Sequence, residues 1–265
     1  MQTSQFRDTV WDFYKSQART DLPWRKTTNP YRILVSEIML QQTQVERVIP
    51  FYKEWTKKFP SARALADASL SDVLKVWQGL GYNRRAKALH EAGKALAGRP
   101  FPRTREELEK LPGIGSYTAG AVLAFAYNEE VVMVETNIRT VITHHYFSKR
   151  GNVTDEEIRL ILIKTLPNGK SREWYWALMD YGSYLKKNGI QLNSKKKGYT
   201  KQKTFEGSNR QARGVIVKCL THKSATLHTL TNMLPKRVEQ LAEAVKELLA
   251  EGIIEKKGTH YQLPT

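Results

Sequence analysis

The sequence predicts an all-α protein, with a long helical core followed by a small winged-helix-like domain. Three observations support this prediction. Apolar residues recur at three- and four-residue spacing through residues 1–187, a basic polar stretch then interrupts the pattern, and residues 208–265 show three short helical patterns followed by a hairpin. The predicted organisation is a helical domain at 1–187, a basic linker at 188–207 and a winged-helix-like domain at 208–265.

The core divides into helices at turn residues, chiefly Gly, Pro and Asn. No convincing run of alternating polar and apolar residues predicts a strand in this part of the chain. The helices are expected at residues 5–18, 31–45, 46–58, 70–78, 83–97, 104–109, 117–127, 136–146, 154–165 and 171–187.

The last part of the chain has its own sequence signals. Serine begins the patterns at 208–220 and 224–234, and proline begins the one at 235–250, so each is expected to form a helix. A hairpin is expected to turn at Lys257-Gly258. Three helices followed by a two-stranded wing is the order of a winged helix, which usually binds duplex DNA but also serves as a protein-contact module.

The charge balance indicates a polyanion as partner. The 265 residues carry 43 Lys and Arg against 26 Asp and Glu, a net charge of +17, and such an excess favours nucleic acid. A basic membrane-surface protein and a merely basic soluble protein are the competing interpretations. No apolar run approaches the roughly 20 residues that span a bilayer, and the N-terminus lacks a signal segment. The expected location is the cytoplasm, with nucleoid association if the source is prokaryotic.

The single cysteine, Cys219, excludes an internal disulfide, a four-cysteine zinc site and a four-cysteine iron–sulfur cluster. It lies in the apolar run VIVKCL and is expected to be a small buried residue.

Two carboxylates stand in unusual surroundings. Glu37 lies inside YRILVSEIMLQQTQV, on a helix of apolar residues, where it needs a partner or a function. Burial would raise its pKa, so it could act as a general acid, although a structural hydrogen bond is as good an explanation. Glu135 directly follows an apolar run in VVMVETNIRTV. Taken alone, Glu135 is best explained as the first residue of a helix.

The stretch LPGIGSYTAGAV predicts a helix–hairpin–helix turn. Gly113 and Gly115 flank a tight turn, and the free N–H groups of the following helix, at Ser116 and Thr118, point toward any anion placed there. Such a turn binds a DNA backbone phosphate without reading sequence, whereas the simpler explanation is an ordinary αα-hairpin.

These features together resemble the helix–hairpin–helix (HhH-GPD) DNA glycosylase superfamily, and most of all the MutY-type adenine DNA glycosylases. The resemblance covers about residues 5–187 and implies a two-lobed helical core. It is carried, in family order and spacing, by DLPWR (21–25), NPYRILVSEIMLQQTQVERVIPFY (29–52), WQGLGY (77–82), LPGIGSYTAGAVLAFAY (111–127) and VETNIRTV (134–141).

The resemblance implies a role for each matching residue. Glu37 corresponds to the acid that protonates N7 of adenine. Glu135 corresponds to the catalytic acid that stabilises the oxocarbenium-like sugar, or captures it covalently, before water attacks. Tyr117 implies a monofunctional enzyme, because members that cut the strand carry lysine there. The remaining positions are Asn137 beside the catalytic acid, Leu22, Trp24 and Arg25 in the base pocket, and Gln42 and Tyr82 as wedge residues.

Three departures from the family pattern are expected to matter. The catalytic residue is Glu135 where the family has Asp. The four-cysteine iron–sulfur loop is absent; its first cysteine would fall near Lys186, and lysines of the basic stretch are expected to take over its phosphate contacts. Lys195, Lys196 and Lys197 are the residues expected to do so. The winged-helix-like unit is expected to stand in place of the family's C-terminal domain, which checks for 8-oxoguanine opposite the adenine.

The leading hypothesis is a monomeric enzyme that removes adenine mispaired with 8-oxoguanine or guanine in double-stranded DNA. A related branch that acts on thymine or uracil opposite guanine also carries tyrosine at the position of Tyr117. A non-catalytic mismatch-binding protein, inactive through Glu135, is the third hypothesis. No cofactor is expected apart from a monovalent cation at the hairpin turn, and neither a membrane nor a known protein partner is implied.

Overall fold

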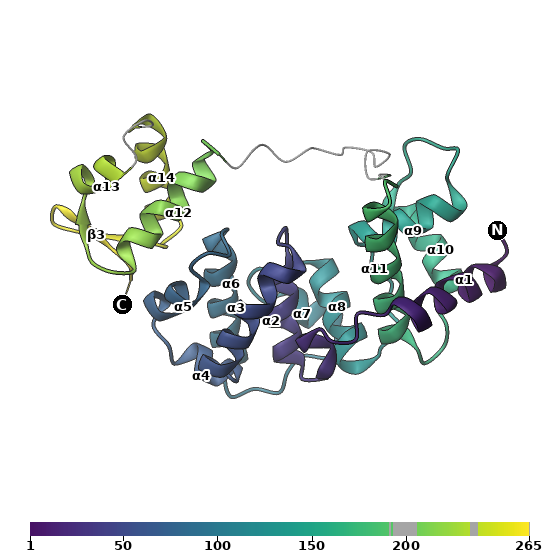
Figure 1. Cartoon of the computed structure of the whole chain (residues 1–265). Coiled ribbons are helices and arrows are strands. Elements are labelled where there is room, and N and C mark those ends of the chain that lie inside the picture. Colours follow the sequence, from purple (N-terminus) through teal and green to yellow (C-terminus); the bar gives the residue numbers. More distant parts are fainter. Residues whose placement is uncertain (191, 193–205, 234–237, 265) are drawn as a thin grey trace. The chain divides into compact units, whose positions relative to one another are not determined.

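The computed structural model describes residues 1–190, 192, 206–233 and 238–264, and most of them are helical (Figure 1). They form two compact units that do not follow chain order. Unit 1 comprises Met1–Leu34, Pro102–Lys110 and Ile114–Lys201, and unit 2 comprises Val35–Phe101, Leu111–Gly113 and Gln202–Thr265. The predicted all-α class is confirmed in part, because the described residues are mostly helical but also form a small three-stranded sheet. The three predicted domain ranges stay a prediction.

Helix α11 is central to unit 1. It packs against α1, α8 and α9. Where α1 meets α11, Phe6 of α1 lies edge-on to Trp174 of α11, with ring centroids 5.9 Å apart. The elements of unit 1 are α1 (Thr3–Gln17), η1 (Pro23–Lys26), α7 (Arg105–Glu109), α8 (Ser116–Tyr127), α9 (Thr136–Tyr146), α10 (Asp155–Thr165) and α11 (Ser171–Lys187), and α2 (Pro30–Leu40) begins there.

Helix α8 forms the apolar interior of unit 1. Every residue from Thr118 to Ala126 is buried. A helix that is apolar on all sides is stable only inside a core, which explains why the run TAGAVLAFA has no polar face. At its C-terminal end Asn128 adopts a left-handed conformation, φ 59°, that ends the helix.

Unit 2 contains the end of α2 and two groups of short helices. Trp55 and Trp77 pack edge to face in its core, with centroids 5.5 Å apart. Ser61 caps α4, a helix that the sequence analysis did not predict. The elements of unit 2, besides the end of α2, are α3 (Val45–Lys58), α4 (Ala62–Ala66), α5 (Leu70–Trp77), α6 (Asn83–Leu96), α12 (Asn209–Leu220), α13 (Leu227–Met233), α14 (Val238–Ala250), β1 (Ala225–Thr226), β2 (Glu255–Lys257) and β3 (His260–Gln262).

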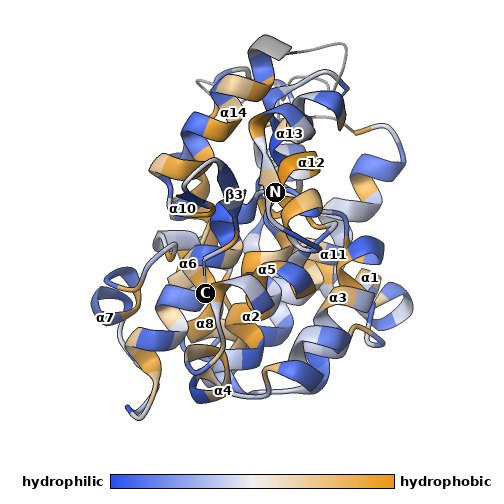
Figure 2. Cartoon of the chain, turned by 90° about the vertical axis from the view of Figure 1, so that its left-hand side faces the viewer, coloured by the Kyte–Doolittle hydropathy of each residue, from blue (hydrophilic) through white to orange (hydrophobic). Residues whose placement is uncertain are grey.

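The C-terminal residues form three helices and a small antiparallel sheet in the order β1-β3-β2. The predicted hairpin is present, with Gly258 at φ 59° between its strands. Helix α14 carries both apolar and polar residues along its length (Figure 2), and its buried residues Leu241, Ala244, Val245 and Leu248 follow helical spacing. Cys219 is buried, as expected. The predicted helix start at Pro235 lies outside the described residues.

Two predicted helix boundaries are wrong. Residues 225–226, expected to be helical, form β1, because their backbone pairs with His260 and Tyr261 of β3. The helix expected at 31–45 ends at Leu40, and α3 begins separately at Val45. Between them Gln42 adopts a left-handed conformation with φ 54°.

Among the described residues, no helix is long and apolar enough to cross a membrane.

Candidate active site

Glu135 begins helix α9 and caps it with its own carboxylate. Its backbone is extended (φ −128°, ψ 164°), and its Oε2 accepts hydrogen bonds from the N–H groups of Asn137 (2.7 Å) and Ile138 (3.3 Å). The amide Nδ2 of Asn137 donates to Oε1 at 2.9 Å. The helix-start explanation is therefore confirmed. It is compatible with the catalytic one, because the same N–H groups and the helix dipole favour the ionised carboxylate.

Burial and charge act in opposite directions on Glu135. Burial raises the pKa of its carboxyl group, while the ammonium of Lys186 and the two backbone donors of α9 lower it, and Arg19 lowers it further. The net effect is a pKa above the ordinary value of a glutamate. A carboxylic acid with a raised pKa loses its charge at a less acidic pH, so the rate of any step that needs ionised Glu135 falls earlier on acidification.

Tyr117 and the exposed end of the helix–hairpin–helix turn lie at the start of α8. Gly115 is the N-cap, and Ser116 and Tyr117 form the first turn. Arg105 of α7 fixes this turn, because its Nη1 donates to both the carbonyl and the hydroxyl of Ser116 at 2.8 Å. Gly115 and Ser116 are exposed, but Thr118 is buried, so any contact of Thr118 with a phosphate would have to use its backbone N–H.

Gly113 is required at its position in unit 2. Its φ is +75°, and a Cβ atom there would lie 2.7 Å from Cβ of Ala88 on α6. Another side chain would therefore be strained by the backbone and would also clash. The hairpin turn passes this close to α6 only because position 113 is glycine.

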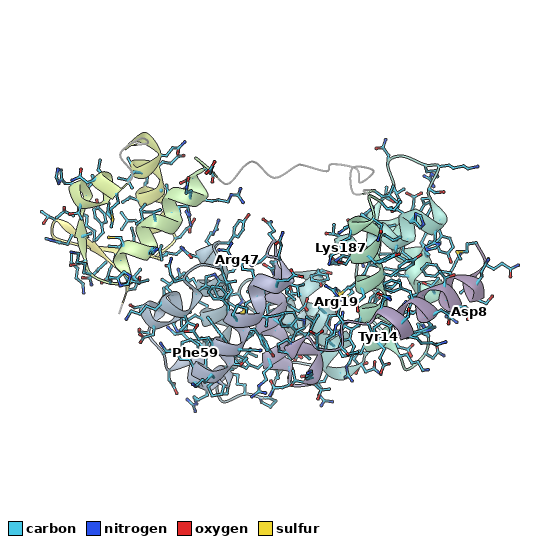
Figure 3. All side chains as sticks on the ribbon, in the orientation of Figure 1. Asp8, Tyr14, Arg19, Arg47, Phe59 and Lys187 are labelled. Carbon is cyan, nitrogen blue, oxygen red and sulfur yellow. The ribbon has the colours of Figure 1, made fainter. Side chains whose placement is uncertain are left out.

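The segment assigned to the base pocket is fixed by Asp180 of α11. Arg25 donates to this carboxylate from Nη1 and Nη2, at 2.7 and 2.9 Å, and Arg19 donates from Nε at 2.6 Å. Arg19 follows α1, as Figure 3 shows. Leu22 and Trp24 are buried, at 5% and 7% exposure. Arg25 is thus held by an ion pair that the sequence analysis missed, and its role in the base pocket stays a prediction.

In unit 2, Glu37 lies on the buried part of α2. Every residue from Ile33 to Met39 is buried, and Glu37 itself is 6% exposed. The expectation that Glu37 is buried on an apolar helix is confirmed. Its role as the general acid stays a prediction.

Arg85 of α6 caps the C-terminal end of α2, a role that the sequence analysis did not predict. Its Nη1 donates to the carbonyls of Ile38 (2.9 Å) and Met39 (3.0 Å) and also to that of Gln41. Its guanidinium also lies 5.1 Å from the ring centre of Tyr82. Burial lowers the pKa of Arg85 to about 10, so the group stays charged near neutral pH. A cation at these carbonyls satisfies the end of α2 and stops the helix.

The two predicted wedge residues lie in one pocket of unit 2. Gln42 and Tyr82 both have left-handed backbones, with φ 54° and 52°, and both line a cavity of about 580 Å³. The hydroxyl of Tyr82 accepts a hydrogen bond from Arg210 of α12 at 2.6 Å. At the nearby loop, Arg47, labelled in Figure 3, donates to the carbonyl of Gly79. The structure therefore brings the wedge pair together, although its action on DNA stays a prediction.

Replacing Arg85 with methionine is expected to destabilise the protein by about 2–4 kcal/mol, because several carbonyls at the end of α2 lose a charged donor. Arg84 is a matched control, since its side chain is 76% exposed and lies 3.7 Å from Glu251. Urea unfolding of both variants would measure the difference. Equal stability of Arg85→Met and Arg84→Met would contradict the role given to Arg85.

No group of three or more His, Cys, Asp or Glu residues within the described ranges could hold a metal ion. Lys195, Lys196 and Lys197, predicted to contact phosphate, lie outside the described residues.

Comparison with known proteins shows the family of this chain. A family model described as HhH-GPD superfamily base excision DNA repair protein matches residues 35–168. An adenine DNA glycosylase of Mycolicibacterium smegmatis is 33% identical over 260 residues, which cover 90% of this chain and 89% of that protein. The adenine DNA glycosylase of Buchnera aphidicola subsp. Baizongia pistaciae is 36% identical over 219 residues, covering 78% of this chain. The chain spans 62% of that Buchnera protein's length.

Solved structures show the same fold. A thermostable thymine-DNA glycosylase aligns with a TM-score of 0.60 and 28% identity, over 68% of this chain and 86% of that one. Endonuclease III, in a trapped covalent intermediate with DNA, aligns with a TM-score of 0.56 and 20% identity, over 70% of this chain and 86% of that one. The chain therefore belongs to the HhH-GPD superfamily of base excision DNA repair proteins and is homologous to adenine DNA glycosylases.

Proposed function

We propose that this protein is a monofunctional DNA glycosylase that removes adenine mispaired with 8-oxoguanine or guanine. The observation that carries the proposal is the Glu135 carboxylate, held at the N-terminus of α9 by two backbone N–H groups and by Asn137. The M. smegmatis relative, 33% identical over 260 residues, is an adenine DNA glycosylase. This similarity supports adenine, rather than another base, as the base that is removed.

The proposed reaction divides the work between two carboxyl groups. Glu37, which is buried on α2, donates a proton to N7 of adenine, which makes the base a leaving group. Ionised Glu135 stabilises the positive charge that develops on the sugar as the N-glycosidic bond breaks, and water then attacks. Gln42 and Tyr82 fill the space left by the extruded nucleotide, while Leu22 and Trp24 line the pocket that receives its base.

Replacing Glu37 with glutamine is expected to slow base release about a hundredfold or more, because an amide cannot donate this proton. Labelled duplexes with adenine opposite 8-oxoguanine are incubated with protein and treated with hot alkali, which cuts at abasic sites. Glu46→Gln is the control, since Glu46 is an exposed acid on α3. Parental activity in Glu37→Gln would refute the assignment of the acid.

We also propose that the protein binds double-stranded DNA through the hairpin turn around Gly113, Gly115 and Ser116, helped by its net charge of +17. The C-terminal helices and sheet act as a winged-helix-like module, since their order fits that fold. A four-cysteine iron–sulfur cluster does not fit this sequence, whose single cysteine, Cys219, is buried in α12. Lysines of the basic stretch replace its phosphate contacts.

The monofunctional character rests on Tyr117, which stands where strand-cutting members carry lysine. Reduction with borohydride should therefore not trap the protein efficiently in a covalent complex with a substrate duplex.

One observation favours a second substrate class. The thymine-DNA glycosylase structure is 28% identical and is covered over 86% of its length. A panel of duplexes carrying adenine, thymine or uracil opposite guanine, with detection of the free base, separates the two substrate classes. Release of thymine or uracil without release of adenine would overturn the adenine proposal.

A non-catalytic mismatch-binding role is a further alternative, because Glu135 is one methylene longer than the family's Asp. This alternative predicts no base release by the native chain and recovery of release in Glu135→Asp. Release by the native chain excludes it.

A further inference from the structure

Helix α11 approaches the first turn of α9 closely at Gly182. A Cβ atom added to Gly182 would lie 2.2 Å from the carbonyl oxygen of Asn137 and 2.7 Å from its Cβ. These distances are far below van der Waals contact, so the two helices can touch here only through glycine. Lys186 follows Gly182 by four residues and therefore lies on the same face of α11, one turn further along.

From this position Lys186 reaches the amide of Asn137. Its Nζ donates to Oδ1 at 2.7 Å, and Nδ2 of the same amide donates to Oε1 of Glu135 at 2.9 Å. An ammonium group only donates and an ionised carboxylate only accepts, so this chain of bonds fixes which way the Asn137 amide points. The amide thereby links the cation of Lys186 to the anion of Glu135.

The charged groups that act on Glu135 come from two segments. Lys186 of α11 has the largest favourable effect, and Arg19, which follows α1, has a smaller one. Arg19 is itself bound to Asp180, which offsets its positive charge. The coupling is mutual: burial lowers the pKa of Lys186, whereas the carboxylate of Glu135 opposes that decrease. Lys186 is therefore the principal counter-charge of this carboxylate within the described part of unit 1.

We propose that Lys186 is a positioning residue for the glycosylase reaction, which orients the Glu135 carboxylate through Asn137 and supplies its counter-charge. This inference rests on the proposed glycosylase activity. It gives a function to a lysine in the last turn of α11, just before the basic stretch, and explains why Gly182 brings α11 onto the first turn of α9.

The test measures single-turnover adenine release between pH 5 and 9 for the native chain, Lys186→Met and Lys186→Arg. Removing the cation should raise the pKa of Glu135, so the acidic limb of the rate profile of Lys186→Met should move upward by about one pH unit. Lys186→Arg keeps the charge and should stay close to the native profile. Lys187→Met is the control: Lys187 is the exposed neighbour labelled in Figure 3, and this variant loses the same charge without a shift of the limb.

A second measurement does not depend on activity. Carbon-13 NMR of labelled glutamate follows the titration of the Glu135 carboxyl in the native chain and in Lys186→Met. A higher titration midpoint in the variant supports the inference even if the duplex chosen is not a substrate. An unchanged midpoint, or a rate that falls equally at every pH, would show that Lys186 is only structural. Failure of the native chain to release any base would refute the proposed function, while the NMR result would still decide the role of Lys186.

Discussion

Replacing Glu135 with glutamine is expected to slow adenine release by about a thousandfold while leaving the fold intact. Glutamine keeps an oxygen that can accept the N–H groups of Asn137 and Ile138, so the cap of α9 survives. It lacks the negative charge that stabilises the developing cation on the sugar. Single-turnover rates and thermal unfolding, measured on the same preparations, separate the two effects.

The pH dependence of the rate of adenine release gives a second measurement of the role of Glu135. Native Glu135 acts as an anion, so its rate should fall as the pH decreases through its raised pKa. Glu135→Gln has no group to protonate at this position, and its residual rate should lack that acidic limb. Glu129→Gln removes an exposed acid before the same segment and should behave like the native chain. A variant at Glu135 with native rate and native pH profile would remove this carboxylate from the mechanism.

Replacing Asp180 with asparagine is expected to lower the free energy of unfolding by about 3–5 kcal/mol, the largest stability effect we expect. The Asp180 side chain is 1% exposed and accepts hydrogen bonds from Arg19 and Arg25. Asparagine has one acceptor oxygen and no charge, so it leaves the buried Arg25 guanidinium without its counter-ion. Urea unfolding at pH 7 measures the loss. Asp12→Asn, which breaks an exposed pair with Lys15, should change stability by less than about 1 kcal/mol.

The effect of Asp180 should depend on pH. Burial alone would raise the pKa of Asp180, but the hydrogen bonds and charges of Arg25 and Arg19 bring it below its ordinary value. A carboxyl group with a pKa lower in the folded state contributes stability above its unfolded pKa of about 3.9, and that contribution is lost as the pH falls through the folded value. The gap between the native chain and Asp180→Asn should thus be full near pH 7 and shrink below about pH 4. A gap independent of pH would mean that packing, not charge, dominates.

The sequence predicted those parts of the structure that depend on neighbouring residues. Glu135 follows an apolar run and precedes a helical pattern, and both a cap and a helix are found there. Glu37 is surrounded in sequence by apolar residues and is buried. In each case the evidence lies within one or two helical turns, where periodicity and capping preferences apply.

The features that the sequence analysis missed depend on contacts between distant residues. The helix predicted at 31–45 ends at Leu40, and no residue near Leu40 in the sequence indicates that Arg85, 47 residues after Ile38, will bind the carbonyl groups there. The same is true of Asp180, whose bond to Arg19 spans 161 residues, and of β1, whose partner strand is at the end of the chain. Helix propensity alone does not reveal such tertiary contacts.

The close approach at Gly182 has a consequence for protein engineering. Asp180, Gly182 and Lys186 lie within two turns of α11 and serve three different partners, namely the segment after α1, the backbone of α9 and the Asn137 amide. If α11 were exchanged for the helix of a relative, its three partner segments would have to be exchanged as well, because each contact depends on residues of both segments. Recombination points placed between α9 and α11 should therefore yield few working hybrids, whereas exchanges that move α9, α11 and the segment after α1 together should retain folding and activity.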